Sequence, residues 1–241
     1  MDANRPIPVV LSWSGGKDSS LALEALYRDP RYDVVALLTS VTRDSDRVSV
    51  HGVRRTLLDA QARSLRLPLF EVTLEAASPN DAYEAAFQRG ITALRDVFPQ
   101  VNHLAFGDLF LADVRAYRLT LLARMGMEAL FPLWDLDTAM LAKQFIASGY
   151  RAHLVCVDTQ QLSADFAGRL FDLALLADLG TTVDPCGERG EFHTFVSAGP
   201  IFAEPIPVTV GELVIRDGRF AYRDLVPSLG QYVPSALSSM Q

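Results

Sequence analysis

Cysteine is scarce in this chain of 241 residues, which contains only Cys156 and Cys186 and has no Cys-x-x-Cys pair. This scarcity excludes a disulfide-stapled scaffold and favours a reducing, cytoplasmic setting. The 4 histidines and 2 cysteines also lack the spacing of zinc ligands. We therefore expect no zinc site.

Long apolar runs and an excess of positive charge are lacking too. No charge-free stretch resembles a membrane span or the apolar core of a signal peptide. The chain has 22 Lys and Arg against 29 Asp and Glu, and the formal net charge of −7 argues against binding nucleic acid by bulk charge. We expect neither a membrane nor a nucleic acid as partner. A homodimer is possible, because Tyr232 and Val233 in the tail could dock on a second subunit.

Apolar residues make up 49% of the chain, which is enough to fill a real core. Through the first two-thirds, short apolar runs alternate with helical patterns. Strands are expected at residues 7–13, 33–41, 68–74, 103–107 and 152–157, and helices at 18–27, 53–67, 81–98, 114–125, 138–147 and 164–176. This alternation predicts βαβ units and a mainly parallel sheet.

After about residue 178 the pattern changes to short strands, expected at 192–196, 208–210, 213–216 and 219–223. The dipeptide Asp217-Gly218 between the last two is a strong hairpin signal. We therefore expect an α/β nucleotide-binding domain over residues 1–130. A smaller α+β part that ends in antiparallel strands is expected over residues 131–241.

One stretch between the first strand and the first helix is suited to an anion: Ser12-Trp13-Ser14-Gly15-Gly16-Lys17-Asp18-Ser19. Adjacent glycines expose backbone N–H groups, and the helix that follows presents the positive end of its dipole. Lys17 can offer a point charge to a phosphate leaving group. The loop is not a Walker A sequence, because Gly-Lys is followed by Asp18, which either caps the helix or helps to hold Mg²⁺.

The run from Ser14 to Ser19 resembles the S-G-G-x-D-S signature of the PP-loop ATP pyrophosphatases, also called adenine nucleotide alpha hydrolases. This resemblance implies a doubly wound, mainly parallel, Rossmann-like sheet. It also implies cleavage of ATP between its α and β phosphates, adenylation of a substrate and release of pyrophosphate. A nucleophile, often ammonia or a sulfur species, then displaces AMP.

Further stretches are similar to the diphthine–ammonia ligase branch. They are Val50-His51-Gly52, Phe106-Gly107-Asp108, Phe131-Pro132-Leu133-Trp134, the run over 184–195 and Gly199-Pro200-Ile201-Phe202. The run over 184–195 follows the family pattern G-E-x-G-E-[FY]-x-T-F. Family members that act on diphthine usually carry Glu-Asn where this chain has Thr120-Leu121, so the acceptor stays open.

The resemblance and the strand-end positions together give the candidate site. Nucleotide binding is expected from Ser12, Ser14, Gly15, Gly16, Lys17, Asp18, Ser19, Thr39, Ser40, His51 and Gly107. Catalytic roles are expected for Asp18, Asp108, Arg118, Glu188 and Glu191, and Mg²⁺ is expected at Asp18 and Asp108.

Each of these assignments has a plainer alternative. Thr39 and Ser40 end the second expected strand, where they would either contact a ligand or simply cap the strand end. Asp108 binds Mg²⁺, orients an amine or caps a helix. Arg118 stabilises an acyl-adenylate phosphate or lies on a helix surface.

The loop residues carry alternatives as well. His51 contacts the nucleotide or is merely solvated. Glu188 and Glu191 hold Mg²⁺, bind ammonium, act as a general base or form a solvated turn. Cys186 is a nucleophile only if a base lies near it, and is otherwise a structural thiol.

These observations predict an ATP-dependent ligase with ATP and Mg²⁺ as cofactors. It would adenylate an acceptor carboxylate, release pyrophosphate and form an amide with ammonia or an amine. The acceptor would be a small molecule or a protein side chain. Two alternatives stay open: a PP-loop enzyme that acts on tRNA or a sulfur donor, and a module that binds ATP or AMP without turnover.

Overall fold

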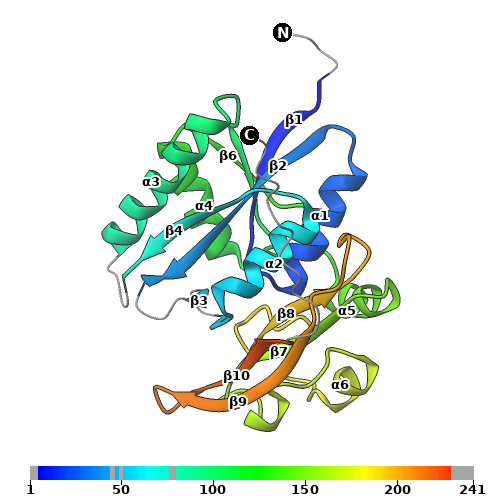
Figure 1. The fold of residues 1–241 in the computed structure, drawn as a ribbon. Helices are drawn as coiled ribbons and strands as arrows, with labels where there is room; N and C mark the ends of the chain where they lie inside the picture. Colours follow the sequence, from blue (N-terminus) through cyan, green and yellow to red (C-terminus); the bar gives the residue numbers. More distant parts are fainter. Residues whose placement is uncertain (1–4, 44–46, 49–50, 76–79, 229–241) are drawn as a thin grey trace, which may run out of the picture.

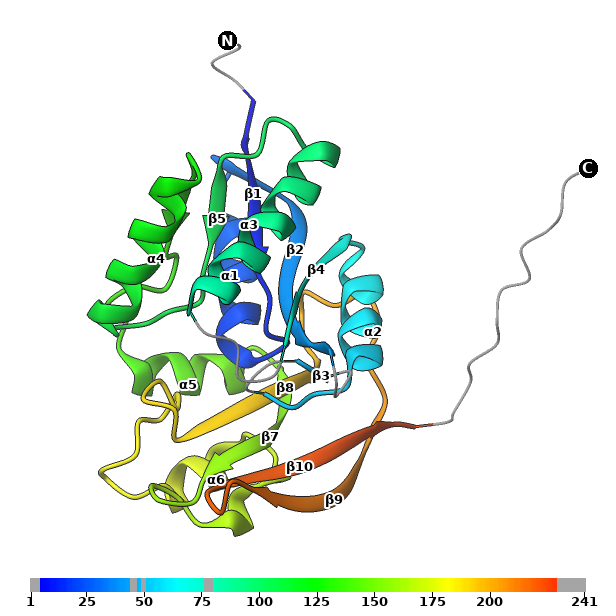
Figure 2. The same cartoon turned by 90° about the vertical axis from the view of Figure 1, so that its left-hand side faces the viewer.

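The computed structural model describes residues 5–43, 47–48, 51–75 and 80–228, which form two β-sheets with flanking helices (Figures 1 and 2). Val50, Tyr232 and Val233 lie outside the described residues. Within the described part, no helix is both long and apolar enough to cross a bilayer.

The first sheet contains five parallel strands in the order β4-β2-β1-β5-β6, with short β3 antiparallel to β2. Their bounds are Ile7–Ser12 (β1), Tyr32–Thr42 (β2), Arg47–Val48 (β3), Leu69–Leu74 (β4), His103–Ala105 (β5) and Glu128–Leu130 (β6). The chain moves outward from β1 to β4 and then returns to β5 on the other side of β1. Between β1 and β5 the strand order therefore reverses, which is where doubly wound sheets bind ligands.

Helices cover both faces of this sheet. They are α1 (Lys17–Arg28), α2 (Arg55–Leu65), α3 (Asn80–Val97) and α4 (Ala112–Arg124). Leu23 and Leu58, from α1 and α2, belong to one buried cluster, whereas Ile91 and Leu122, from α3 and α4, belong to the other. Two helices on each face confirm the doubly wound α/β prediction.

The second sheet is antiparallel, in the order β8-β7-β10-β9. Its strands are β7 (Arg151–Asp158), β8 (Phe192–Ala198), β9 (Val208–Arg216) and β10 (Phe220–Pro227), accompanied by α5 (Thr138–Ala147) and α6 (Leu173–Asp178). Asp217 and Gly218 have φ values of 54° and 60° at the turn between β9 and β10, which confirms the predicted hairpin. Val9 of β1 and Phe195 of β8 share one core cluster, so the sheets are joined by apolar packing.

The helix predicted over 164–176 is wrong. The structure has a 3₁₀ turn at Ala164–Phe166, an extended stretch and then α6 (Leu173–Asp178). Gly168 has a φ of 95°, which no helix accommodates, and its N–H donates to the Leu154 carbonyl of β7. Asp172 then starts α6 by accepting a hydrogen bond from the Leu175 N–H. The stretches predicted as strands at 208–210 and 213–216 are both strand, and the structure joins them into one continuous element, β9.

Candidate active site

The loop between β1 and α1 has no room for side chains at its two glycines. Gly15 has a φ of 79°, and a Cβ there would lie 2.6 Å from Leu58 Cδ2. A Cβ on Gly16 would lie 3.0 Å from the Thr194 carbonyl oxygen. The paired glycines are therefore a steric requirement of this loop.

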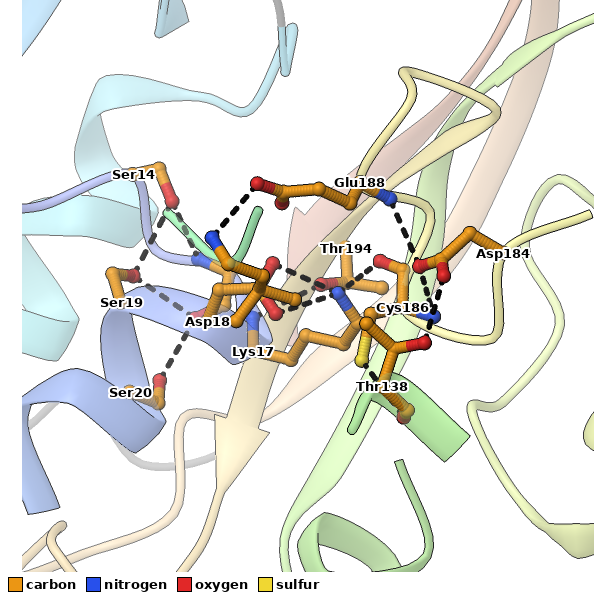
Figure 3. Close-up of polar contacts among 12 residues, drawn as sticks. Ser14, Lys17, Asp18, Ser19, Ser20, Thr138, Asp184, Cys186, Glu188 and Thr194 are labelled. Atoms are coloured by element: carbon orange, nitrogen blue, oxygen red, sulfur yellow. Dashed lines mark hydrogen bonds and ion pairs between the residues drawn. The ribbon is translucent and has the colours of Figure 1, made fainter. Parts of the chain in front are cut away.

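Serine hydroxyls gather at the start of α1 (Figure 3). Ser14 Oγ accepts from the Gly16 N–H at 3.3 Å and lies 3.3 Å from Ser19 Oγ. The Ser19 and Ser20 hydroxyls each donate to the Gly16 carbonyl at 3.0 Å. Hydroxyls and the positive end of the α1 dipole therefore meet at one place, which suits a phosphate.

The loop is also fixed to the second sheet. The Val196 N–H donates to the Gly15 carbonyl at 2.9 Å, and the Lys17 N–H donates to Thr194 Oγ1 at 3.0 Å. Gln61 Nε2 donates to the carbonyls of both Gly15 (3.0 Å) and Val196 (2.6 Å). As a result, β8 forms one wall of the site.

Lys17 points its ammonium toward the C-terminal part of the chain. Nζ donates to both carboxylate oxygens of Asp18 at 2.8 Å and to the carbonyl of Cys186, and it lies 5.9 Å and 5.7 Å from the ring centroids of Phe171 and Phe192. Burial alone would lower the pKa of Lys17, but Asp18, Cys186 and Glu188 together outweigh burial and the pKa is raised. The ammonium therefore has a full set of protein partners.

Asp108 and Arg118 form an ion pair beside the first loop. Arg118 Nε lies 2.7 Å from Asp108 Oδ2, and Nη2 donates to Oδ1 at 3.1 Å. Burial raises the pKa of Asp108 although Arg118 opposes the shift. A Cβ on Gly107 would lie 2.8 Å from the carbonyl carbon of Asp18, so only glycine lets the segment after β5 approach α1 this closely.

Glu188 reaches this segment from the C-terminal part. Its Oε1 accepts a hydrogen bond from the Leu109 N–H at 2.8 Å. Burial raises the pKa of Glu188 to about 7, with the Leu109 N–H opposing the shift and the Asp18 carboxylate adding to it. A carboxyl group that titrates near neutrality in a pocket is suited to accepting and releasing protons.

Glu191 has different surroundings from Glu188. It is 1% exposed, and its carboxylate accepts from the N–H groups of Asp184 (2.8 Å) and Arg189 (2.9 Å). Asp184 in turn accepts from the N–H groups of Cys186 (2.9 Å) and Glu188 (3.3 Å). Two buried carboxylates therefore order the 184–191 turn from inside, and Glu191 does not face the pocket.

These elements enclose a pocket of about 790 Å³, open mouth included, beyond the carboxyl ends of β1 and β5. Eleven of the predicted residues line it: Ser12, Ser14, Gly16, Lys17, Asp18, Ser19, His51, Gly107, Asp108, Arg118 and Glu188. Gly15, Thr39, Ser40 and Glu191 do not line it. Thr39 and Ser40 do not end their strand either, because β2 continues to Thr42.

The pocket also contains residues that the sequence interpretation assigned no role, namely Phe106, Gly187, Gly190, Phe192, His193 and Thr194. His193 lies beside His51, with 4.4 Å between ring centroids, and burial lowers its pKa well below the usual value. All six lie inside stretches used for the family resemblance. Their position inside these stretches was the one feature of the sequence that could have identified them as pocket residues.

Cys186 is buried, and its Sγ lies 3.3 Å from the Thr138 carbonyl oxygen. Burial raises the pKa of Cys186 to about 12 and that of Cys156 to about 11. Neither thiol is activated, which favours the structural interpretation of Cys186.

A glycine- and serine-rich loop at the start of a helix, placed at the switch point of a doubly wound sheet, is a place where such folds bind nucleotide phosphates. The sequence from Ser14 to Ser19 assigns this loop to the PP-loop class. Family models give the particular branch. The model described as diphthamide synthase N-terminal domain matches residues 7–129, and the model described as diphthamide synthase C-terminal domain matches residues 137–220. The chain belongs to this family, the diphthine–ammonia ligases.

Curated relatives agree with this membership. The diphthine–ammonia ligase of Danio rerio is 28% identical over 86% of this chain and 89% of its own length. The human (Homo sapiens) enzyme of that name is 26% identical over 84% of this chain and 83% of its own length. The Schizosaccharomyces pombe relative is 26% identical, but only 36% of its length is matched.

Proposed function

We propose that this chain is an ATP-dependent ligase that adenylates an acceptor carboxylate and converts it to an amide with ammonia or an amine. The observation that carries the proposal is a single pocket in which the anion-binding start of α1 faces Asp108, Arg118 and Glu188. The family membership and the names of the relatives, diphthine–ammonia ligases, support the same activity.

ATP would lie with its phosphates at the loop of Ser14, Gly16 and Ser19. These groups supply hydroxyls, a backbone turn without a side chain, and the positive end of α1. His51 on the pocket wall would contact the nucleoside. The protein would contribute mainly positioning and charge neutralisation, as expected for nucleotidyl transfer.

The carboxylates on the pocket wall fit a magnesium ion that arrives with the nucleotide. Among the described residues, no group of three or more His, Cys, Asp or Glu side chains could hold a metal by itself. Mg²⁺ usually takes one or two carboxylates and completes its shell with phosphates and water, and Asp18 and Asp108 offer such a set. When bound, Mg²⁺ would neutralise charge on the phosphates.

The chemistry proceeds in two displacements. An acceptor carboxylate oxygen attacks the α-phosphorus, and the bond from that phosphorus to the oxygen bridging the β-phosphate breaks, which releases pyrophosphate. The nitrogen of ammonia then attacks the acyl carbon, and AMP leaves with the former carboxylate oxygen. Arg118 would stabilise the acyl-adenylate phosphate, and Glu188 would accept the proton that nitrogen loses.

The part of the chain over residues 131–241 would complete the site rather than bind nucleotide on its own. It supplies Glu188, His193 and Thr194 to the pocket, whereas residues 1–130 supply the phosphate loop, Asp108 and Arg118. We propose this division of labour between the two sheets.

The test supplies ATP, Mg²⁺ and ¹⁵N-ammonium with a diphthine-bearing protein, the acceptor named for the relatives, and with small carboxylic acids in parallel. The proposal expects AMP, pyrophosphate and a ¹⁵N-amide in equal amounts, all dependent on the acceptor. An ATP-binding module without turnover would bind ATP and yield none of the three, whichever acceptor is present.

A further inference from the structure

A second cavity lies between α3 and α4, next to the pocket described above. It measures about 500 Å³ with its open side, and Tyr83 and Phe87 of α3 face Val114 and Tyr117 of α4 across it. The residues that α4 buries are Leu121 and Leu122, in its second half. The first half of α4 is therefore not packed closely against α3, and this leaves the groove.

The two cavities share a wall. Phe106 and Arg118 line both of them, and the guanidinium carbon of Arg118 lies 4.1 Å from the Phe106 ring centroid. Arg118 contacts Asp108 through Nε and Nη2. A guanidinium carries five N–H donors, so Arg118 keeps further donors at the boundary between the cavities.

The Arg118–Asp108 pair is itself incompletely satisfied. Arg118 Nε and Asp108 Oδ2 are ion-pair partners 2.7 Å apart, but their contact is out of line for a hydrogen bond, and among the described residues neither buried atom has another partner. Buried polar atoms left in this way in a native structure call for an explanation such as a ligand. A substrate carboxylate would accept from the N–H donors of Arg118 that face away from Asp108, and it would leave the ion pair with Asp108 in place.

The walls beyond Arg118 are aromatic and aliphatic, so a charged group would lose more hydration there than it gains. Tyr83 lies near Arg118, since the guanidinium opposes the rise that burial causes in the pKa of Tyr83. The phenol stays protonated at neutral pH and adds one O–H donor to the wall of this cavity. The groove suits an apolar group attached to a carboxylate.

We propose that the cavity between α3 and α4 is the acceptor subsite, which holds the apolar part of a carboxylic acid whose carboxylate lies at Arg118. This assignment rests on the proposed ligase function, because it places that carboxylate beside the nucleotide pocket. The substrate class is then an acid with an aromatic or branched aliphatic group near its carboxylate, whether free or on a protein side chain.

The test uses 4-phenylbutyrate as the probe and acetate as the control carboxylate, which lacks the apolar group. Each is titrated against the full chain by ligand-observed NMR. Val114→Trp fills the groove, Val114→Phe is a milder second variant, and Leu119→Trp is the matched control on an exposed position of the same helix. We expect 4-phenylbutyrate to bind the unmodified chain and the control at least about tenfold more tightly than Val114→Trp. ATP affinity, measured by calorimetry, should stay within about twofold in all of them.

The subsite is overturned if 4-phenylbutyrate binds the unmodified chain no better than acetate, or if both Val114 variants leave its affinity unchanged. Failure of the ligase function gives a different pattern. In that case the probe discriminates the variants as expected, while no acceptor yields AMP and pyrophosphate. Conversely, an active ligase whose acceptor kcat/KM is unchanged by Val114→Trp and Val114→Phe contradicts the subsite alone.

Discussion

The ammonium of Lys17 donates to the backbone carbonyl of Cys186, 169 residues further along the chain. Lys17 is 2% exposed, and the same ammonium is shared with the Asp18 carboxylate. This contact ties the phosphate loop to the turn that carries Glu188. Lys17 therefore holds two halves of the site together, a role that its place in a phosphate loop did not suggest.

We expect Lys17→Met to lower the free energy of unfolding more clearly than it lowers ATP affinity. The substitution removes the ammonium donor that the Cys186 carbonyl and the Asp18 carboxylate share, a loss of about 1–3 kcal/mol or more. Urea unfolding and calorimetric ATP titration measure the two effects. Arg28→Met, at the exposed end of α1, is the control. A stable Lys17→Met protein with strongly weakened ATP binding would instead place the ammonium on a phosphate.

Gly16→Val tests the phosphate loop. The new side chain would collide with the Thr194 carbonyl oxygen, 3.0 Å from the first added carbon, and would displace the backbone that faces the phosphates. We expect ATP affinity to fall by more than about a hundredfold, measured by calorimetry. Gly180→Val is matched to it, because the nearest atom at that position is 4.0 Å away. Unchanged ATP binding in Gly16→Val would remove the loop from the nucleotide site.

Glu188→Gln tests whether the Glu188 carboxyl group titrates near neutral pH. The folded chain holds the Glu188 proton more tightly than the unfolded chain does, since burial raises the pKa from 4.5 to about 7. Its contribution to stability is therefore full below pH 4.5 and is lost as the pH rises through about 7. We expect Glu188→Gln to flatten this part of the pH profile of the unfolding free energy and to be the more stable protein at about pH 8.

The control for that experiment is Glu212→Gln, an exposed glutamate on β9. If Glu188→Gln and Glu212→Gln keep the same pH profile as the unmodified chain, Glu188 does not titrate near neutrality. Its use as a proton acceptor at that pH would then be wrong.

Glu191→Gln separates a structural carboxylate from a catalytic one. Glu191 accepts two backbone hydrogen bonds from the 184–191 turn and lies outside the pocket. We expect thermal unfolding to show a loss of about 1–3 kcal/mol, while ATP affinity is retained. Arg189→Gln, an exposed change in the same turn, should leave stability nearly intact. Unchanged stability with lost amide formation would return Glu191 to a catalytic role.

Local patterns predicted much of this molecule. The Ser14–Ser19 loop, the alternation of strands and helices and the Asp217-Gly218 turn each depend on neighbours in the sequence, and the structure has all three. The strand predicted over 33–41 matches β2, but Thr39 and Ser40 lie inside it rather than at its end. Pairing with β4 extends the strand to Thr42.

What sequence reasoning missed depends on contacts between distant residues. Nothing near Lys17 indicates that Phe171, Cys186 and Phe192 surround its ammonium. The prediction of a helix over 164–176 was wrong for a similar reason, because the backbone around Gly168 forms hydrogen bonds with β7 instead. The two glutamates of the 187–191 turn look equivalent in sequence, and only the fold turns one inward and the other into the pocket.

The hydrogen bond from the Val196 N–H to the Gly15 carbonyl has a consequence for synthesis on the ribosome. Val196 follows Gly15 by 181 residues, so the phosphate loop leaves the exit tunnel well before the strand that braces it. Domains fold as they emerge, so a nascent chain would form its first sheet with this loop unsupported. Competence to bind nucleotide would then arise late, when β8 arrives and closes the site.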